Sequence, residues 1–384
     1  MKSVLILSST YKPNIGGIES FLEEFMKFLG GSGYFSYLLT FKQATYSKVL
    51  HVKKLPSKPI EKTKICEIRR HNYFDFSLYT LFKSNFVRDI FTFLNIFIHG
   101  FLFLLNYKNK ISIIHAQDPP TATAAFFLSK IFKKKWVVSF HNIYRLSKRG
   151  IRGLIGRYIL QNCPCIFAIS KPVINRLKKD LKKPLPKIVL SKYWIDTKLF
   201  RPKDRTIYDK KIRLTKDDLI VLFVGRVTKS KGIPELIDAS RLLKNVKLLI
   251  VGSGDLEEYV KRFQNKNLIF LGPKVGEELV DCYNVANVSI FPTTYSYEGF
   301  GRVIIESLAC GTPVIISDKM PFEAISQKVG MVIKPTPQKI ANALNLFDRY
   351  FPRNIRSICR DFAIENYSEK NAIVILNIYK SLIL

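Results

Sequence analysis

The chain has 384 residues, of which 47% are apolar, so it can form two ordinary domains with full cores, and this composition excludes a disordered chain. The formal net charge is +32, and the excess lies in the first half: up to Arg205 there are 37 basic and 11 acidic residues, against 25 and 19 in the remainder. This asymmetry indicates either a polyanionic partner near the first half or a basic surface that is only solvated.

Nucleic acid is not the expected partner, because the sequence has no recognition-helix signature, zinc-finger spacing or aromatic RNA-binding motif. The six cysteines are scattered, and Cys163-Pro164-Cys165 lacks a second pair at zinc-ligand spacing, so reduced and mostly buried thiols are expected. Residues 4–7 are too short an apolar run for the core of a signal peptide, which predicts a cytoplasmic protein.

The first half alternates predicted strands and helices. Residues 4–8 predict a strand, a turn with Gly16 and Gly17 follows, and the apolar residues from Ile18 to Leu29 recur at helical spacing. Strand, glycine turn and helix are typical of the start of a doubly wound domain. Further strands are expected at residues 34–40, 111–115, 136–140 and 166–169.

Residues 90–105 form the most apolar segment, with twelve apolar residues in sixteen. A spanning helix needs about 20 apolar residues, so a buried helix is the main expectation and a spanning helix the alternative. A third possibility is partial insertion into a membrane interface, helped by the basic residues at its ends. These are Lys83, Arg88, Lys108 and Lys110.

The second half begins after a polar, proline-containing stretch at residues 196–206, which predicts a linker. Strands are then expected at residues 219–224, 246–251, 268–271, 288–291 and 314–317, with helical stretches between them. The fold class is therefore α/β, with two Rossmann-like, doubly wound parallel-sheet domains in series. Because ligands bind at the carboxyl ends of parallel strands, the cleft between the domains is the expected site.

A cationic turn follows the strand at 219–224. Arg226 and Lys231 lie in a turn bounded by Gly225 and Gly232, where the two cations could bind a diphosphate and stabilise its departure. The alternative is a surface loop with ordinary charges. The nearby Gly252-Ser253-Gly254 lacks the spacing of a dinucleotide fingerprint.

Residues 292–317 carry the main candidate site and read as loop, helix and strand. Small residues at the helix start let phosphates approach the free N–H groups there, where the helix dipole also favours negative charge. Glu298 lies just before this helix and Glu306 about two turns inside it. The pair could hold hydroxyl groups on either side of the phosphates, which predicts a clamp for a nucleotide-sugar.

The predicted first-domain strands also end in polar residues. His141 follows the strand at 136–140, where it could contact a sugar hydroxyl or shield positive charge through its carbonyl, or have only a structural role. His115 and Asp118 are expected to form a turn, and Glu19 to favour a helix N-terminus.

Taken in order, these features resemble glycosyltransferase family 4, whose members have the GT-B fold, over nearly the whole chain. The most specific segment is EGFGRVIIESLACGTPVI, which starts at Glu298. The others are Gly16-Gly17-Ile18-Glu19, His141 after the fourth strand, and the turn from Gly225-Arg226 to Lys231-Gly232.

The resemblance implies roles for these residues. Glu306 would bind the ribose diol of the donor, and Glu298 would hold hydroxyls of the transferred sugar. Arg226 and Lys231 would take the diphosphate, and His141 would contact the donor sugar. Two backbone groups complete the set: Gly16 and Gly17 would let the first domain approach the diphosphate, and the N–H groups of Phe300, Gly301, Arg302 and Val303 would contact the sugar and phosphates.

The resemblance also implies a reaction, which is glycosyl transfer with retention of anomeric configuration. No general base is evident and no Asp-x-Asp metal motif is present, so no metal cofactor is expected and the departing phosphate would accept the proton of the acceptor. A UDP-hexose is the favoured donor because of its frequency in the family, and a guanosine donor is the alternative. The implied domains are residues 1–205 on the acceptor side, 206–365 for the nucleotide-sugar, and 366–384 as a helix that crosses back to the first domain.

Two segments depart from the family pattern. Tyr193-Trp194-Ile195-Asp196 replaces the usual turn at the domain junction, and the segment from Asp318 to Glu323 replaces a glycine-rich one. The expected acceptor is a glycan or lipid-linked saccharide at an anionic, cytoplasmic membrane face, to which the enzyme would be peripheral. A nucleotide-sugar epimerase and a non-catalytic nucleotide-binding protein are the alternatives. The sequence does not indicate an oligomeric state.

Overall fold

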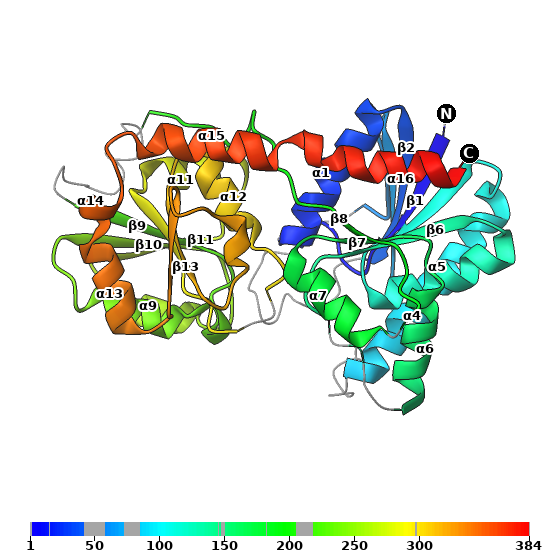
Figure 1. Cartoon of the computed structure of the whole chain (residues 1–384), viewed down its shortest axis with the longest axis horizontal. Coiled ribbons are helices and arrows are strands. Elements are labelled where there is room, and N and C mark those ends of the chain that lie inside the picture. The colour runs from blue at the N-terminus through cyan, green and yellow to red at the C-terminus, as the bar shows by residue number, and fades with distance from the viewer. Residues whose placement is uncertain are drawn as a thin grey trace. The chain divides into compact units, whose positions relative to one another are not determined.

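The computed structural model describes residues 2–14, 16–41, 58–72, 85–144, 146, 150–181, 183–204, 218–295 and 298–383. These residues fold as two compact units (Figure 1). The chain passes from the first unit to the second between Tyr193 and Trp194, and returns to the first at Asn371. The boundary predicted at residues 205/206 falls within the stretch 205–217, which lies outside the described residues.

The described strands of the first unit form one eight-stranded sheet in the order β3-β4-β2-β1-β5-β6-β7-β8. The pairs are parallel apart from β3 with β4, which confirms a parallel α/β sheet. The strands are β1 (Lys2–Leu7), β2 (Tyr34–Phe41), β3 (Ile60–Lys62), β4 (Cys66–His71), β5 (Ile111–Ala116), β6 (Lys135–Phe140), β7 (Ile166–Ala168) and β8 (Ile188–Leu190).

The sequence did not predict β4, because the apolar alternation of its residues, CEIRRH, is interrupted at Arg70. Arg70 is nevertheless buried in this strand. Its guanidinium donates to the carbonyl oxygens of Lys12 and Lys58 and pairs with Glu61 at 3.1 Å. Such contacts compensate for the burial of a charge, and no local pattern reveals them.

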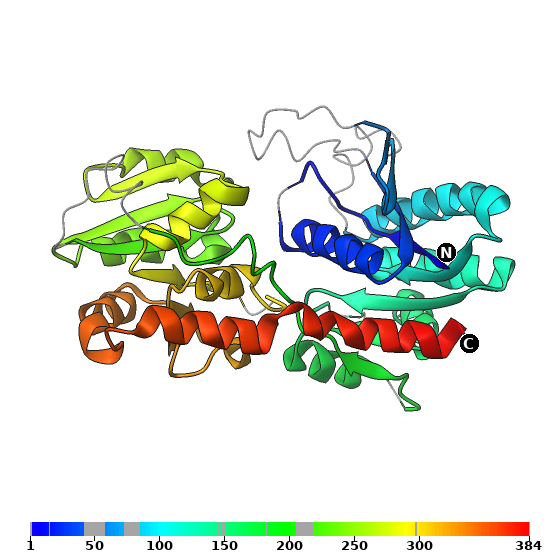
Figure 2. The ribbon, with the colours of Figure 1, turned by 90° about the horizontal axis from the view of Figure 1, so that it is seen from above.

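Helices cover both faces of the first sheet. The helices α4, α5 and α6 lie side by side on one face, whereas α1 and α16 pack on the other (Figure 1). Figure 2 shows α16 in red against this sheet. The bounds are α1 (Gly17–Gly31), α4 (Asn85–Tyr107), α5 (Pro119–Phe132), α6 (Gly150–Gln161), α7 (Lys171–Asp180) and α16 (Ile373–Ile383).

The expectation of a buried helix at residues 90–105 needs a correction. The helix α4 covers the sheet with one face, but five of its large apolar side chains are exposed on the other. Residues Asp89–Tyr107 are also long and apolar enough to cross a membrane, and 33% of this stretch is buried in the fold.

The described strands of the second unit form a six-stranded sheet in the order β11-β10-β9-β12-β13-β14, with parallel pairs throughout. Four of the strands have the predicted bounds. The strands are β9 (Leu219–Val224), β10 (Val246–Val251), β11 (Leu268–Gly272), β12 (Val288–Phe291), β13 (Val314–Ser317) and β14 (Gly330–Ile333).

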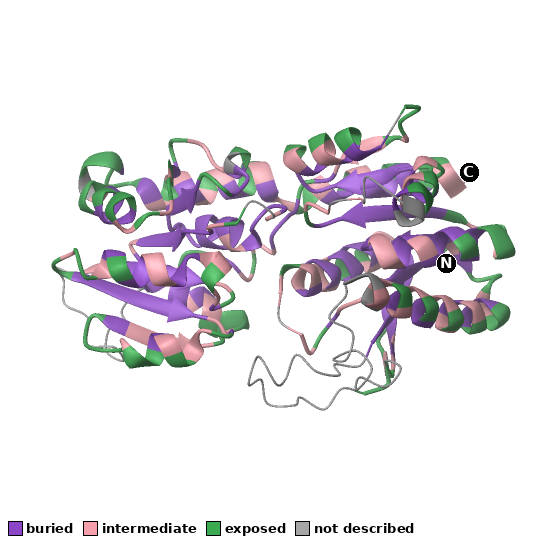
Figure 3. Ribbon diagram, turned by 90° about the horizontal axis from the view of Figure 1, so that it is seen from below, coloured by how far each residue is buried: buried purple, intermediate pink, exposed green. Residues whose placement is uncertain are grey.

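Helices α9 and α13 lie on one face of this sheet, and α11, α12 and α15 on the other (Figure 1). Figure 3 shows that the strands of both sheets are mostly buried, as expected of parallel sheets with helices on both faces. The bounds are α9 (Ile233–Ser240), α10 (Glu257–Arg262), α11 (Gly276–Val285), α12 (Arg302–Ala309), α13 (Pro337–Asn345), α14 (Phe347–Tyr350) and α15 (Ile355–Tyr367).

Candidate functional site

The second sheet has one point where the order of strands reverses, between its neighbours β9 and β12. In open parallel sheets the loops that leave such a point diverge to opposite faces and leave room for a ligand at the carboxyl ends of the strands. Here these loops contain the two motifs singled out in the sequence. The turn Gly225–Gly232 follows β9, and the segment that leads to Glu298 follows β12.

Close backbone approach holds these loops together. At Gly232, where φ is +77°, a Cβ atom would lie 2.0 Å from the carbonyl oxygen of Pro292. Beside it, the Thr294 N–H donates to the Ser230 carbonyl oxygen at 3.0 Å. On the other side a Cβ atom at Gly252 would lie 1.8 Å from the carbonyl oxygen of Gly225. These glycines are therefore required by packing of the loops.

The structure brings Lys231 and Glu298 together. The Lys231 ammonium donates to Glu298 Oε2, and the two side chains are 16% and 23% exposed. Lys231 ends a 3₁₀ turn, Lys229–Lys231, that the tight Gly232 backbone fixes next to β12. Arg226 lies in the same turn with an exposed side chain. A cation and a carboxylate from two separate motifs are thus in contact at the carboxyl ends of the strands.

The helix α12 begins at this edge. Gly301 precedes it with φ of +88°, a backbone conformation that favours glycine, and a Cβ atom there would lie 2.7 Å from Met320 Cε. The first N–H groups of a helix make no hydrogen bond within that helix. In α12 the first two of these N–H groups belong to Arg302 and Val303. Phe300 is buried, with its ring 5.5 Å from that of Tyr367.

The Arg302 side chain turns away from this helix start. It is buried, and its guanidinium donates to the Trp194 carbonyl oxygen at 3.3 Å and lies 3.8 Å from Glu306 Oε1. The Arg302 side chain therefore anchors the residue that opens the second unit, and the contact of its backbone N–H with the donor stays a prediction.

Glu306 lies inside α12 and is buried. Burial raises the pKa of its carboxyl, against the opposing effects of the Arg302 guanidinium and of the Tyr283 hydroxyl. That hydroxyl donates to Glu306 Oε2 at 2.9 Å. Tyr283 comes from α11 and was not found in the sequence, because nothing in its local pattern distinguishes it from a core tyrosine. The carboxylate is thus oriented by two neighbours before any ligand arrives.

In the first unit, His141 follows β6 directly and is buried. Its Nε2 lies 2.9 Å from Gln117 Oε1 and its Nδ1 lies 2.7 Å from the Tyr193 hydroxyl. A neutral ring that donates from Nε2 to the amide oxygen and accepts at Nδ1 from the hydroxyl satisfies both contacts. His141 is therefore fixed by Gln117 and Tyr193, two residues that sequence reasoning did not select for this role.

The loop after β1 is fixed by side-chain hydrogen bonds. The Thr10 hydroxyl donates to Glu19, and Asp118 accepts from the Ser9 hydroxyl at 2.6 Å. Asp118 also caps the start of α5, which agrees with its predicted role in a turn. Gly17, the first residue of α1, is exposed, and Gly16 before it is extended. The Glu19 carboxylate lies beside this helix start, since a Cβ atom at Gly16 would be 2.6 Å from Glu19 Oε2.

His115 has a structural role. Its Nδ1 lies 2.5 Å from the Tyr379 hydroxyl on α16, and its Nε2 lies 2.7 Å from the Ser139 hydroxyl. Burial, with a smaller effect of His141, lowers the pKa of the His115 imidazole to about 3. A neutral histidine thus joins β5 to the C-terminal helix.

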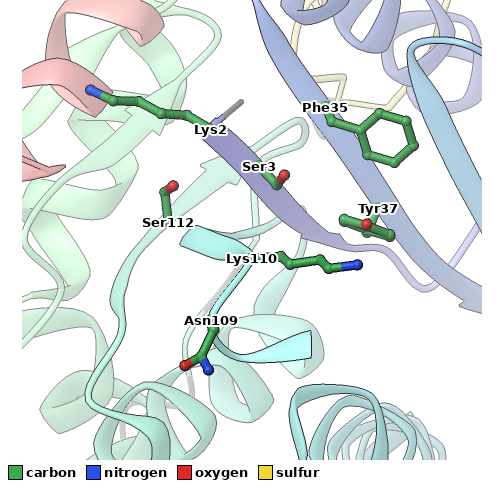
Figure 4. Close-up of a pocket in the computed structure, with 7 residues that line it drawn as sticks. All are labelled: Lys2, Ser3, Phe35, Tyr37, Asn109, Lys110 and Ser112. Carbon is green, nitrogen blue, oxygen red and sulfur yellow. The ribbon is translucent and has the colours of Figure 1, made fainter. Parts of the chain in front are cut away.

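Figure 4 shows a surface pocket of about 510 Å³ in the first unit, lined by Lys2, Ser3, Phe35, Tyr37, Asn109, Lys110 and Ser112. These residues lie at the amino ends of β1, β2 and β5. The pocket therefore lies at the amino ends of the strands, whereas His141 lies at their carboxyl ends. It takes no part in the candidate site.

All six cysteines are buried and free, as expected. Burial raises the pKa of the Cys165 thiol to about 11, which is typical of an inert structural cysteine. In the part of the chain that the structure describes, no group of three or more His, Cys, Asp and Glu side chains could hold a metal ion. The independence of the reaction from metals stays a prediction.

Comparison with known proteins agrees with this geometry. Residues 204–348 match the family described as Glycosyl transferases group 1. This range holds Arg226, Lys231, Glu298 and Glu306. An uncharacterized glycosyltransferase of Methanocaldococcus jannaschii, MJ1607, is 28% identical over 299 residues, which cover 71% of this chain and 76% of that protein.

Two solved structures have the same fold. The chain is similar to sucrose-phosphate synthase from Thermosynechococcus elongatus, with a TM-score of 0.81 and 21% identity over 100% of this chain and 99% of that one. It is also similar to Anabaena HepE, crystallised in complex with UDP, with a TM-score of 0.74 and 18% identity over 99% and 100% of the two chains. These likenesses show that the chain has the GT-B fold. The matched segment and the relative support a glycosyltransferase function for it.

Proposed function

We propose that this glycosyltransferase is of the family 4 type and moves a hexose, with retention of configuration, from a nucleotide-sugar to a glycan or lipid-linked saccharide. UDP-hexose is the favoured donor. The observation that carries the proposal is the meeting of Lys231 and Glu298 at the strand reversal, beside the start of the helix that holds Glu306. A cation for phosphate and two carboxylates for hydroxyls lie in one half-site.

In this proposal the donor replaces the contact between Lys231 and Glu298. The Lys231 ammonium and the Arg226 guanidinium bind the diphosphate, and Glu298 accepts from hydroxyls of the hexose. Glu306, oriented by Tyr283, accepts from the ribose diol. The N–H groups at the start of α12 supply positive electrostatic potential next to the phosphates.

The transfer step breaks the bond between the sugar C1 and the β-phosphate oxygen and forms a bond from C1 to the acceptor oxygen on the same face. The acceptor hydroxyl gives its proton to the departing phosphate oxygen, so no protein base is required. Negative charge grows on the diphosphate as the bond breaks, and the cations of Lys231 and Arg226 stabilise it. Neither cation needs to transfer a proton.

The proposed acceptor side is the first unit. The basic excess of its sequence suits an acceptor that carries pyrophosphate, or one presented at an anionic cytoplasmic membrane face. The fold of HepE, which was crystallised with UDP, supports a uridine nucleotide as the donor carrier.

The decisive experiment is calorimetry with a panel of nucleoside diphosphates, followed by a screen of nucleotide-sugars for transfer and hydrolysis. We expect UDP to bind most tightly, a UDP-hexose to be consumed, and NMR of the product to show the anomeric configuration of the donor. Activity that survives EDTA would support the proposed independence of metals. Release of an epimerised free sugar without any acceptor would favour an epimerase, and binding without turnover would favour a non-catalytic role.

A further inference from the structure

The outer side of α4 is an exposed apolar stripe. Ile90, Leu94, Ile98, Leu102 and Leu105 follow one another at intervals of one helical turn, and each is 38% to 53% exposed. Isolated exposed leucines are common on soluble proteins, but a stripe along a whole helix is not.

The stripe continues over the two neighbouring helices. Phe127 of α5 lies 5.9 Å from the Phe93 ring of α4, and together with Leu154 and Tyr158 of α6 it lines an apolar depression of about 370 Å³. Among the side chains that the structure describes, the large exposed apolar ones on α5 are Phe127 and Ile131, and those on α6 are Leu154, Ile155 and Tyr158. These five residues and the α4 stripe are called the apolar face below.

The fold holds α4 in place beneath this face. A Cβ atom at Gly100 would lie 2.6 Å from Leu128 Cδ1, so the two helices approach closely there. Asn95 and Thr92 of α4 are buried against the fold. A helix that crossed a bilayer would have to leave this packing and expose the sheet beneath it. The apolar face suits a helix that lies in the membrane interface.

Basic residues lie at one end of the apolar face. Lys108 follows α4 and Lys134 follows α5, and burial together with the nearby Lys108 ammonium lowers the pKa of the Lys134 ammonium. The sequence of residues 85–161 is also strongly basic, with twelve lysines and arginines and two acidic residues, Asp89 and Asp118. Like charges gathered at one end of an apolar surface are complementary to anionic lipid headgroups.

We propose that the apolar face on α4, α5 and α6 docks the enzyme on an anionic lipid bilayer, with the side chains in the interface and the lysines on the headgroups. This inference rests on the proposed function, since a lipid-linked acceptor would be met at that surface. A second copy of the chain is a poorer occupant, because both copies carry the same formal net charge of +32 and would repel each other.

Flotation of the full chain with vesicles tests the proposal. We expect the protein to float with vesicles of phosphatidylcholine and phosphatidylglycerol, to float less with phosphatidylcholine alone, and to dissociate as salt rises. Replacing Leu102→Glu together with Leu154→Glu, at the two helices farthest apart in the face, should weaken vesicle binding about tenfold or more. Leu242→Glu with Leu346→Glu, at exposed positions of the second unit, is the matched control.

Three results would overturn the proposal. The first is that the apolar-face variant floats as completely as the parent. The second is that the parent stays on the vesicles after an alkaline wash, which indicates a spanning helix. The third is that the parent is a dimer and the variant is a monomer, which assigns the face to self-association. Binding of a nucleoside diphosphate, measured without vesicles, keeps the two proposals apart. If the parent does not bind a nucleoside diphosphate, the proposed function is refuted whatever the flotation shows. If the variant binds it as the parent does, the variant is folded.

Discussion

The ammonium of Lys231 and the carboxylate of Glu298, 67 positions apart in the sequence, form an ion pair at the carboxyl edge of the second sheet. Both are partly buried, so each charge compensates the other while no ligand is bound. In the proposed function this contact keeps both side chains where the donor would bind. Donor binding would then replace the ion pair with contacts of Lys231 to the diphosphate and of Glu298 to hydroxyls of the hexose.

Replacing Lys231→Ala should lower turnover about 100-fold, because the lost cation would stabilise the departing diphosphate most when its charge is greatest. Donor KM should change less. Lys229→Ala in the same 3₁₀ turn is the control, since the Lys229 side chain is exposed and its backbone carbonyl is kept. Steady-state kinetics check both variants. Equal loss in the two would show that the turn, not the Lys231 charge, matters.

Glu306 should make donor binding depend on pH. The proposed diol contact needs the ionised carboxylate, and burial raises its pKa above the ordinary 4.5, so affinity should fall on acidification sooner than for an exposed glutamate. Tyr283→Phe removes a hydrogen bond that favours the ionised form and should move this fall to higher pH. Calorimetry across the acidic range measures it.

Glu306→Gln provides the control for that experiment. It cannot ionise, so its affinity should be lower by roughly 10- to 100-fold at neutral pH, as for the loss of a charged hydrogen-bond acceptor, and should show no such fall. A pH profile of Glu306→Gln that matches the parent would show that another group titrates.

Gly232→Ala should destabilise the second unit by about 3 kcal/mol, because its Cβ atom would overlap the Pro292 carbonyl oxygen and its φ is positive. Gly272→Ala is a matched control, since its φ is +67° and nothing lies within 4 Å of the added atom. Gly272→Ala should lower the free energy of unfolding by only about 1 kcal/mol, because only the backbone conformation is strained. Urea unfolding of the two variants gives the difference. Equal costs would mean that the loops separate without penalty.

His115 should make the first unit less stable in mild acid. Its native pKa of about 3 lies below the ordinary 6.5, so the unfolded chain binds a proton between these values while the native state does not. Stability from this group is fully present above pH 6.5 and is lost on acidification by at most about 1.4 kcal/mol per pH unit. Hydrogen exchange of the β5 and α16 amides at a series of pH values measures this.

His115→Gln separates that effect from other titrations. The variant should be less stable than the parent at neutral pH, because the contacts with Tyr379 and Ser139 change, but the dependence of exchange on pH should be weaker. An unchanged slope would assign the acid sensitivity to other groups.

Much of the architecture could be predicted locally. Parallel strands buried on both faces are continuous apolar runs, and β9, β10, β12 and β13 were found with their bounds for that reason. The cationic turn and the pair of glutamates were found because glycines and charges at strand ends stand out from these runs. The strand β4 was missed because Arg70 is buried there among distant carbonyl oxygens.

The sequence by itself determined that the chain is α/β with two domains, and it predicted a site formed by the turn after residue 224 and the segment from Glu298 to Glu306. Those properties depend on residue type and short-range spacing. The tertiary structure decided what only long-range contacts set: that Lys231 meets Glu298, that Tyr283 orients Glu306, that Gln117 and Tyr193 fix His141, and that the apolar side chains of three helices share one exposed face. Each depends on strand order and helix packing, which bring together residues that no local pattern relates.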